Sequence, residues 1–295
     1  MDLFRGSFRK LPVNPDLRLF VYNTESPEPK SKKRALLLID PQNDFIAEWG
    51  SLKVPGAIED SVRVAEAIRA NIQSIDSIFV TLDTHQRMHI AHPLFWKNKE
   101  NDHPKPFTQI TSDDLIGGVW TTVNEGFRSW ALFYVKELEK QKKFKLIIWP
   151  EHCLVGSKGH AVFDVLIDAL HEWEGATSKS VSFLMKGNNA LTEHYSAFKA
   201  EVIRETDPHS SLNIPFIKTL DSYDEILVAG QAMSHCVNYS VRDLVENLPA
   251  KSRGKIRVLS DGCSTITGFE EASKKFQIDT ENHGVKFVKV ADAFQ

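Results

Sequence analysis

The sequence has few cysteines, no long apolar run and little excess charge, and each absence excludes a class of protein. Three cysteines occur among 295 residues, none in a C-x-x-C pair. Such low usage argues against a disulfide framework and for free thiols in a reducing compartment. No stretch approaches the roughly 18 apolar residues of a membrane span. A formal net charge of -3 gives no reason to expect nucleic acid as a partner.

The N-terminal region lacks the features of a targeting segment. It has no apolar run followed by a small-residue cleavage site, and its acidic residues are unlike an acid-poor transit peptide. We therefore expect a cytoplasmic protein that does not associate with a membrane. We interpret residues 1–34 as an arm, with an added edge strand at 17–22, and residues 35–295 as a single domain.

The chain does contain a repeated alternation of short apolar runs and helical patterns. Continuous apolarity is typical of strands covered on both faces in a parallel sheet. Such runs lie at residues 35–39, 77–82, 144–149, 180–185, 225–229 and 255–259. Helical spacing of apolar residues occurs at 58–75, 130–138, 161–173, 192–205 and 237–246. The alternation predicts a doubly wound α/β fold with a mostly parallel six-stranded sheet and helices on both faces.

A polar segment rich in proline and glycine interrupts the alternation at residues 87–127. Connections of this length are uncommon inside a compact domain and often serve as lids or binding loops. We interpret this segment as a lid-like insertion.

Residues able to do chemistry follow five of the predicted strands. Active sites of such sheets lie outside the carboxyl ends of the strands, so these residues are expected to converge on one edge. They comprise a carboxylate, a lysine, a thiol and a D-x-H…H set: Asp40, Lys186, Cys236, Asp83, His85 and His152.

The thiol, the carboxylate and the lysine each have a functional and a structural interpretation. Cys236 stands at a predicted strand-to-helix turn, where N–H groups stabilise a thiolate or an oxyanion. A free cysteine is otherwise a small buried hydrophobe, which is our interpretation of Cys153 and Cys263. Asp40 either caps the turn after its strand or takes the proton of the thiol. Lys186, at the tip of a core strand, could hold Asp40 ionised or stabilise negative charge.

A second set of residues suits a metal ion. Asp83, His85 and His152 offer one oxygen and two imidazole nitrogens, which fits zinc, iron or manganese at a catalytic site with open positions. A lone D-x-H is also common as a structural hydrogen-bonded pair. His89 and His92 lie nearby in the sequence and compete as ligands, which leaves the third ligand open.

Taken in order, these motifs resemble those of the nicotinamidases, which belong to the isochorismatase-like cysteine hydrolases. The similar segments are LIDPQNDF at 38–45, DTH at 83–85, WPEHC at 149–153, KG at 186–187 and GQAMSHC at 230–236. The Asp, Lys and Cys motifs together are specific for the superfamily. The D-x-H and W-P-x-H-C motifs are typical of its metal-containing nicotinamidase branch.

The resemblance implies a reaction and a role for each member of a triad. Cys236 would be the nucleophile, Asp40 the base that takes its proton, and Lys186 the third member. Nicotinamide, a small linear amide, would be hydrolysed to nicotinate and ammonia through a thioester.

The resemblance also implies a cofactor and a pocket. The cofactor would be a divalent metal ion, zinc with iron or manganese as alternatives, bound by Asp83, His85 and His152. A cis peptide bond is implied between Gln231 and Ala232, with the N–H group of Ala232 near the oxyanion. We interpret Phe45 and Trp96 as aromatic walls around a pyridine ring.

Two alternatives stay open. Ser234 and His235 stand where some nicotinamidases carry an acidic and an aromatic residue, so another amidase or a carbamoyl hydrolase of the superfamily is the first alternative. Relatives that hydrolyse isochorismate lack the cysteine, so Cys236 argues against that activity. The second alternative is a binding module that keeps the fold without turnover. Because family members often form dimers or larger assemblies, a homo-oligomer is also open.

Overall fold

The computed structural model describes residues 32–141 and 144–295. The predicted arm therefore lies almost wholly outside the described residues, and so does its predicted edge strand at 17–22. Within the described ranges, no helix is both long and apolar enough to cross a membrane.

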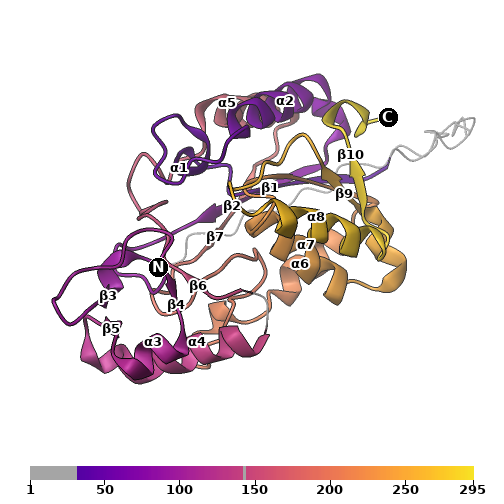
Figure 1. Ribbon diagram of the computed structural model, residues 1–295. Helices are drawn as coiled ribbons and strands as arrows, with labels where there is room; N and C mark the ends of the chain where they lie inside the picture. Colours follow the sequence, from indigo (N-terminus) through magenta and orange to yellow (C-terminus); the bar gives the residue numbers. More distant parts are fainter. Residues whose placement is uncertain (1–31, 142–143) are drawn as a thin grey trace, which may run out of the picture. The chain divides into compact units, whose positions relative to one another are not determined.

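A six-stranded sheet, parallel throughout, forms the centre of the described chain (Figure 1). The strand order β10-β9-β8-β1-β2-β7 places β1 and β8 in the middle, and both are almost entirely buried. Burial on both faces explains why these strands appear in the sequence as continuous apolar runs. The strands are β1 (Arg34–Ile39), β2 (Ser77–Asp83), β7 (Ser182–Lys186), β8 (Glu225–Gly230), β9 (Ile256–Leu259) and β10 (Lys286–Val288).

Helices cover both faces of this sheet, which confirms the predicted doubly wound architecture (Figure 1). On one face α2 (Ala57–Ala70) packs against α5 (Asp164–Thr177), and on the other α7 (Cys236–Asn247) packs against α8 (Glu270–Glu281). Buried Val64, Ala65 and Ile68 recur on one side of α2, as an amphipathic helix requires. The remaining α-helices are α1 (Asn43–Ile46), α3 (Ser112–Gly117), α4 (Arg128–Gln141) and α6 (Ile214–Asp221). The 3-10 helices are η1 (Ile72–Ser74), η2 (Pro93–Phe95), η3 (Glu125–Phe127), η4 (Pro208–Ser210), η5 (Ala250–Lys255) and η6 (Val290–Asp292).

The sixth strand of the sheet is not the predicted run at 144–149, and this prediction was wrong. Only β6 (Leu146–Ile147) is extended there, and it pairs antiparallel with β4 (Gln109–Ile110), outside the central sheet. β10 fills the sixth place instead, at the edge next to β9. Residues 146–149 are buried, and the N–H groups of Ile148 and Trp149 donate to the carbonyls of Thr108 and Ala91 in the inserted segment.

The polar segment at 87–127 has its own small elements. β3 (Trp96–Lys97) pairs antiparallel with β5 (Thr121–Thr122), and α3 follows a capping box made by Thr111 and Asp114. Its role as a lid stays a prediction.

The helical pattern at 192–205 was also misleading, because the backbone there is irregular. Its polar groups are satisfied across the loop: Thr192 Oγ1 donates to the carbonyl of Val202, and the Ala200 N–H donates to the carbonyl of Ser210. Buried Phe198 and Val202 belong to the hydrophobic core, so these hydrogen bonds and apolar packing hold the segment together without a helix.

Candidate active site and metal centre

The structure brings Asp40, Lys186 and Cys236 together at the carboxyl edge of the sheet. Lys186 Nζ lies 2.8 Å from Asp40 Oδ2 and 3.6 Å from Cys236 Sγ. All three side chains are buried. They come from the turn after β1, the last residue of β7 and the first residue of α7. A parallel sheet places these three positions on one edge although they are far apart in the sequence.

Asp40 is held in place by the neighbouring strand. Its N–H donates to Thr81 Oγ1 at 3.0 Å, and the Thr81 hydroxyl donates to Asp40 Oδ1 at 2.6 Å. The φ angle of Asp40 is 45°, in the left-handed region that non-glycine residues seldom adopt. Such a conformation persists only where the surroundings fix it, and here β2 does so.

Burial raises the pKa of the Cys236 thiol well above its usual value, although Lys186 acts in the opposite direction. The start of α7 was expected to favour the thiolate, but desolvation of the charged form outweighs that effect. The thiol therefore keeps its proton until a base removes it. Asp40 is suited to that exchange, because burial also raises its pKa while Lys186 lowers it.

Lys186 is a buried cation between two carboxylates. Its Nζ also lies 3.1 Å from Asp83 Oδ1 and donates to the carbonyl of His194 at 2.8 Å. Burial lowers the pKa of Lys186, but Asp40 and Asp83 together raise it well above the usual value. Gly187, with φ of 77°, lets the chain pass close by, because a Cβ there would lie 2.7 Å from Asp83 Oδ1.

Asp83, His85 and His152 also converge, at a place where they could hold a divalent metal ion. Asp83 Oδ2 lies 3.0 Å from His85 Nε2 and 3.4 Å from His152 Nε2. The ring nitrogen Nδ1 of His152 lies 2.8 Å from the carbonyl oxygen of Pro150, which can only accept a hydrogen bond. The proton of the neutral ring is therefore on Nδ1, and Nε2 faces the set with a free lone pair. The donors fit a metal ion of the zinc, iron or manganese class.

A small cavity lies beside the thiol, and it contains one of the two predicted aromatic walls. Phe45 lines it, but Trp96 does not. Trp96 is fully buried, and its indole N–H donates to the carbonyl of Ile90 within the inserted segment. β3 thus places this ring in the local core and away from the cavity. The lining residues are Phe45, Leu52, Asp83, Trp149, His152, Glu193, Tyr195, Ala232, His235, Cys236 and Ile266.

Among the lining residues that were not predicted, three are aromatic or charged: Trp149, Tyr195 and Glu193. The indole N–H of Trp149 donates to the hydroxyl oxygen of Tyr195 at 2.9 Å, which fixes two aromatic rings of the wall. Glu193 Oε1 accepts from the N–H of His194 and lies 3.9 Å from His85 Nε2, while Oε2 is buried without a partner. The only available signal was that Trp149 belongs to the W-P-x-H-C motif, and that Glu193 and Tyr195 follow Lys186 closely.

The turn before Cys236 has the predicted cis peptide bond between Gln231 and Ala232. Gly230 precedes it with φ of 120°, and a Cβ at that position would lie 2.0 Å from the carbonyl oxygen of Ile39. Only glycine allows β8 to leave the sheet so close to β1. The N–H group of Cys236, the first residue of α7, has no partner within the helix, whereas that of Val237 donates to the carbonyl of Ala232 at 3.2 Å.

The chain resembles curated nicotinamidases along almost their whole length. It is 24% identical to the nicotinamidase of Saccharomyces cerevisiae over 263 residues, which cover 86% of this chain and 99% of the relative. It is 24% identical to the nicotinamidase of Escherichia coli over 267 residues, which cover 88% and 96% of the two chains. No family model matches the sequence.

Solved structures of the same class share the fold. The yeast nicotinamidase superposes with a TM-score of 0.61 at 22% identity, covering 86% of this chain and 99% of the other. A pyrazinamidase of Pyrococcus horikoshii, solved in complex with zinc, superposes with a TM-score of 0.53 at 18% identity, covering 87% and 99%. The six-stranded parallel sheet with helices around it is thus the isochorismatase-like fold.

Proposed function

We propose that this chain is a nicotinamidase of the isochorismatase-like family and hydrolyses nicotinamide to nicotinate and ammonia, which its similarity to nicotinamidases in sequence and fold supports. One observation carries the proposal: a buried lysine, Lys186, lies within 2.8 Å of Asp40 and 3.6 Å of the thiol of Cys236. A carboxylate, a cation and a thiol held together out of water are the groups that a cysteine amidohydrolase needs.

The first half of the reaction forms a thioester. Asp40 takes the proton of Cys236, and the thiolate attacks the carboxamide carbon. The N–H groups of Ala232 and Cys236 stabilise the oxyanion, and Lys186 stabilises the negative charge that moves between the thiol and Asp40. Asp40 then returns the proton to the leaving nitrogen, which departs as ammonia.

The second half releases the acid. Asp40 takes a proton from water, whose oxygen attacks the thioester carbon. The carbon–sulfur bond breaks, nicotinate leaves, and the sulfur of Cys236 recovers its proton.

The side chain of Phe45 packs near His152, with ring centroids 5.4 Å apart, so it would form a wall of the pocket beside the pyridine ring.

Asp83, His85 and His152 are the residues that would hold a divalent metal ion, for which we propose zinc, with iron and manganese as alternatives. When bound, this ion would supply a ligand position for the pyridine nitrogen and so orient the ring. We also propose a cytoplasmic location, because the three free, buried cysteines suit a reducing compartment. A homo-oligomer is a further proposal, which size-exclusion chromatography with light scattering would test.

The test compares two buried cysteines. Cys236→Ala should release no ammonia from nicotinamide, whereas Cys263→Ala, which removes a buried thiol outside the cavity, should keep wild-type kcat. Mass spectrometry of acid-quenched wild-type enzyme should show a nicotinoyl adduct on Cys236.

Two results would contradict the proposal in different ways. Wild-type turnover by Cys236→Ala would refute the nucleophile. Ammonia release from other small amides, but none from nicotinamide, would refute the substrate and leave the chemistry intact.

A further inference from the structure

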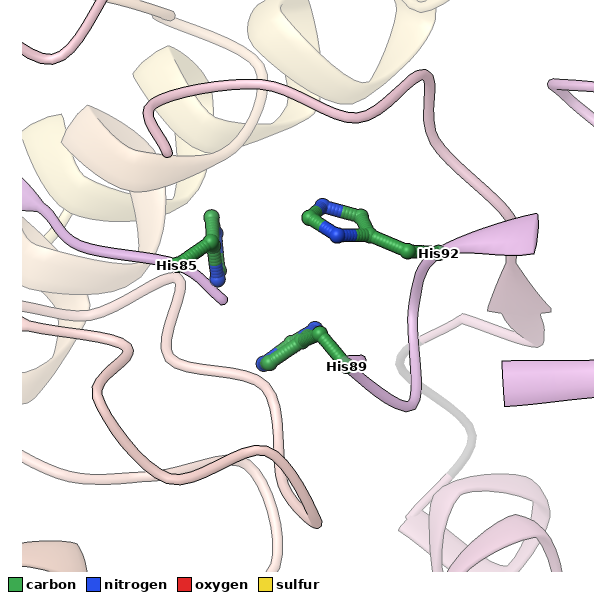
Figure 2. A group of neighbouring side chains, drawn as sticks. All are labelled: His85, His89 and His92. Carbon is green, nitrogen blue, oxygen red and sulfur yellow. The ribbon is translucent and has the colours of Figure 1, made fainter. Parts of the chain in front are cut away.

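Two histidines beside the Asp83–His85–His152 set have no role in the proposed reaction. His89 and His92 lie between β2 and η2, and both are completely buried. Figure 2 shows their rings directed toward the ring of His85. One nitrogen of each ring is buried without a hydrogen-bond partner, which is uncommon in proteins and requires an explanation.

The spacing of the three rings matches that of three imidazoles on one metal ion. The ring centroids are 4.3 Å apart for His85 and His89, 5.0 Å for His85 and His92, and 5.1 Å for His89 and His92. With metal–nitrogen bonds of about 2.0–2.1 Å, three rings on one tetrahedral ion have centroids about 5 Å apart. One nitrogen from each ring already lies within 4.8 Å of the other two.

Each of the three rings has a buried nitrogen without a partner. These atoms are His85 Nδ1, His89 Nε2 and His92 Nε2. Leaving a buried polar atom without a partner costs about 1–3 kcal/mol, and coordination of such an atom to an ion would remove that penalty.

The protonation of two rings can be inferred from their hydrogen bonds. His92 Nδ1 faces the carbonyl oxygen of Gln86 at 3.2 Å, so the proton of the neutral ring is on Nδ1, and Nε2 has a free lone pair. His89 differs, because its Nδ1 accepts from the N–H of Ala91 at 3.2 Å. Binding through His89 Nε2 would move its proton to Nδ1 and break this long hydrogen bond.

We propose that His85, His89 and His92 form a second binding site for a divalent metal ion, next to the Asp83–His85–His152 set. The two sets share His85, whose Nε2 lies 3.0 Å from Asp83 Oδ2 while Nδ1 has no partner. A site of three imidazoles selects ions that prefer nitrogen, such as Zn²⁺, Co²⁺, Ni²⁺ or Cu²⁺, over Mg²⁺ and Ca²⁺. The inference goes beyond the proposed hydrolysis and does not depend on it.

The experiment removes two of the ligands of the Asp83–His85–His152 set and measures whether the protein still binds a metal ion. Metal-free Asp83→Asn/His152→Gln protein is titrated with Co²⁺ in equilibrium dialysis, with elemental analysis and the visible Co²⁺ spectrum as readouts. It should bind one Co²⁺, and a large excess of Mg²⁺ should not displace the ion. Adding His89→Gln/His92→Gln should weaken this binding at least tenfold. Equal Co²⁺ binding by the double and the fourfold variants would overturn the proposal.

A second comparison covers the case in which the first variant does not fold. His89→Gln/His92→Gln in the otherwise wild-type chain should bind less Co²⁺, or bind it more weakly, than the wild type. The matched control is His209→Gln/His283→Gln, which removes two exposed histidines and should leave the isotherm unchanged. Indistinguishable isotherms for the wild type and for His89→Gln/His92→Gln would refute the site.

Discussion

The two ends of the central sheet differ in how many cations pair with each buried carboxylate. At the carboxyl end one cation serves two carboxylates, since Lys186 Nζ lies 2.8 Å from Asp40 and 3.1 Å from Asp83. At the amino end the carboxylate of Glu225 forms ion pairs with three cations, Lys32, Arg34 and Arg257. β1 connects the two clusters, with Arg34 at its start and Asp40 just after its end.

This difference in partners separates a carboxylate suited to proton transfer from one suited to structure. Both carboxylates are buried, with 0% of Asp40 and 4% of Glu225 exposed. Burial raises the pKa of each, but the bonds from Lys32 and Arg34 bring the pKa of Glu225 below its usual value. The pKa of Asp40, with one shared lysine, stays raised. Asp40 lies deeper in the protein and shares one lysine, whereas Glu225 has three cations, so burial and ion pairing together leave only Asp40 with a raised pKa.

The largest expected effect is at the carboxyl end. Asp40→Asn should lower kcat/KM for nicotinamide about a thousandfold, because a positioned base contributes about 10²–10⁴ in rate and the amide cannot take the proton of Cys236. Ammonia release under steady-state conditions measures the loss, and circular dichroism checks the fold. A loss below tenfold would mean that another group takes the proton.

The matching change at the amino end should affect stability and not turnover. Glu225→Gln removes the carboxylate that Arg34 and Arg257 share, and it should lower the free energy of unfolding by about 1–3 kcal/mol. Because the cluster lies at the far end of β8 from Cys236, kcat/KM at 25 °C should stay within about twofold of the wild type. Urea unfolding and ammonia release measure the two quantities. A large loss of activity in a folded variant would contradict the separation of the two ends.

The stabilisation by Glu225 should also depend on pH in a definite direction. Because its pKa is lower in the folded than in the unfolded state, its contribution is complete above the unfolded value of about 4.3 and is lost as pH falls through the folded value. The stability difference between wild type and Glu225→Gln should therefore be constant from about pH 6 to pH 8 and shrink below about pH 4.3. Urea unfolding at several pH values measures it. A difference that grows toward low pH would show that the pKa is raised.

The site residues at the carboxyl end of the sheet could be predicted from the sequence, because the carboxyl ends of parallel strands lie on one edge. Continuous apolar runs identified β1, β2, β7 and β8, and their ends had to meet on one edge. Asp40, Lys186 and Cys236 could therefore be grouped without knowing any loop. The helical positions of α2, α5 and α7 followed from their apolar spacing.

Other parts could not be predicted, since local patterns do not report what a segment packs against. The run at 144–149 has the apolarity of a core strand, yet its short strand β6 pairs with β4 of the insertion and not with the central sheet. β10 (Lys286–Val288) has only three residues and none is fully buried, so it is too short to form a recognisable apolar run in the sequence. Residues 192–205 carry helical spacing, but their backbone is irregular and Thr192 Oγ1 donates across the loop to the carbonyl of Val202. The raised pKa of Cys236 reflects burial, which the sequence does not reveal.

The smallest expected effect tests whether the three cations of Glu225 are equivalent. The side chain of Lys32 is 54% exposed, whereas that of Arg257 is 18% exposed. Exposed ion pairs contribute about 0–1 kcal/mol because water and salt screen them, so Lys32→Gln should lower the free energy of unfolding by less than about 0.5 kcal/mol. Arg257→Gln should lower it more, since its partner Glu225 is buried. Urea unfolding at low and high ionic strength distinguishes them, because salt should abolish the small effect and only reduce the larger one. If Lys32→Gln lowered the free energy of unfolding as much as Glu225→Gln, a single exposed lysine would account for the whole ion-pair contribution. The presence of three cations would then not explain why the pKa of Glu225 is lowered while that of Asp40 is raised.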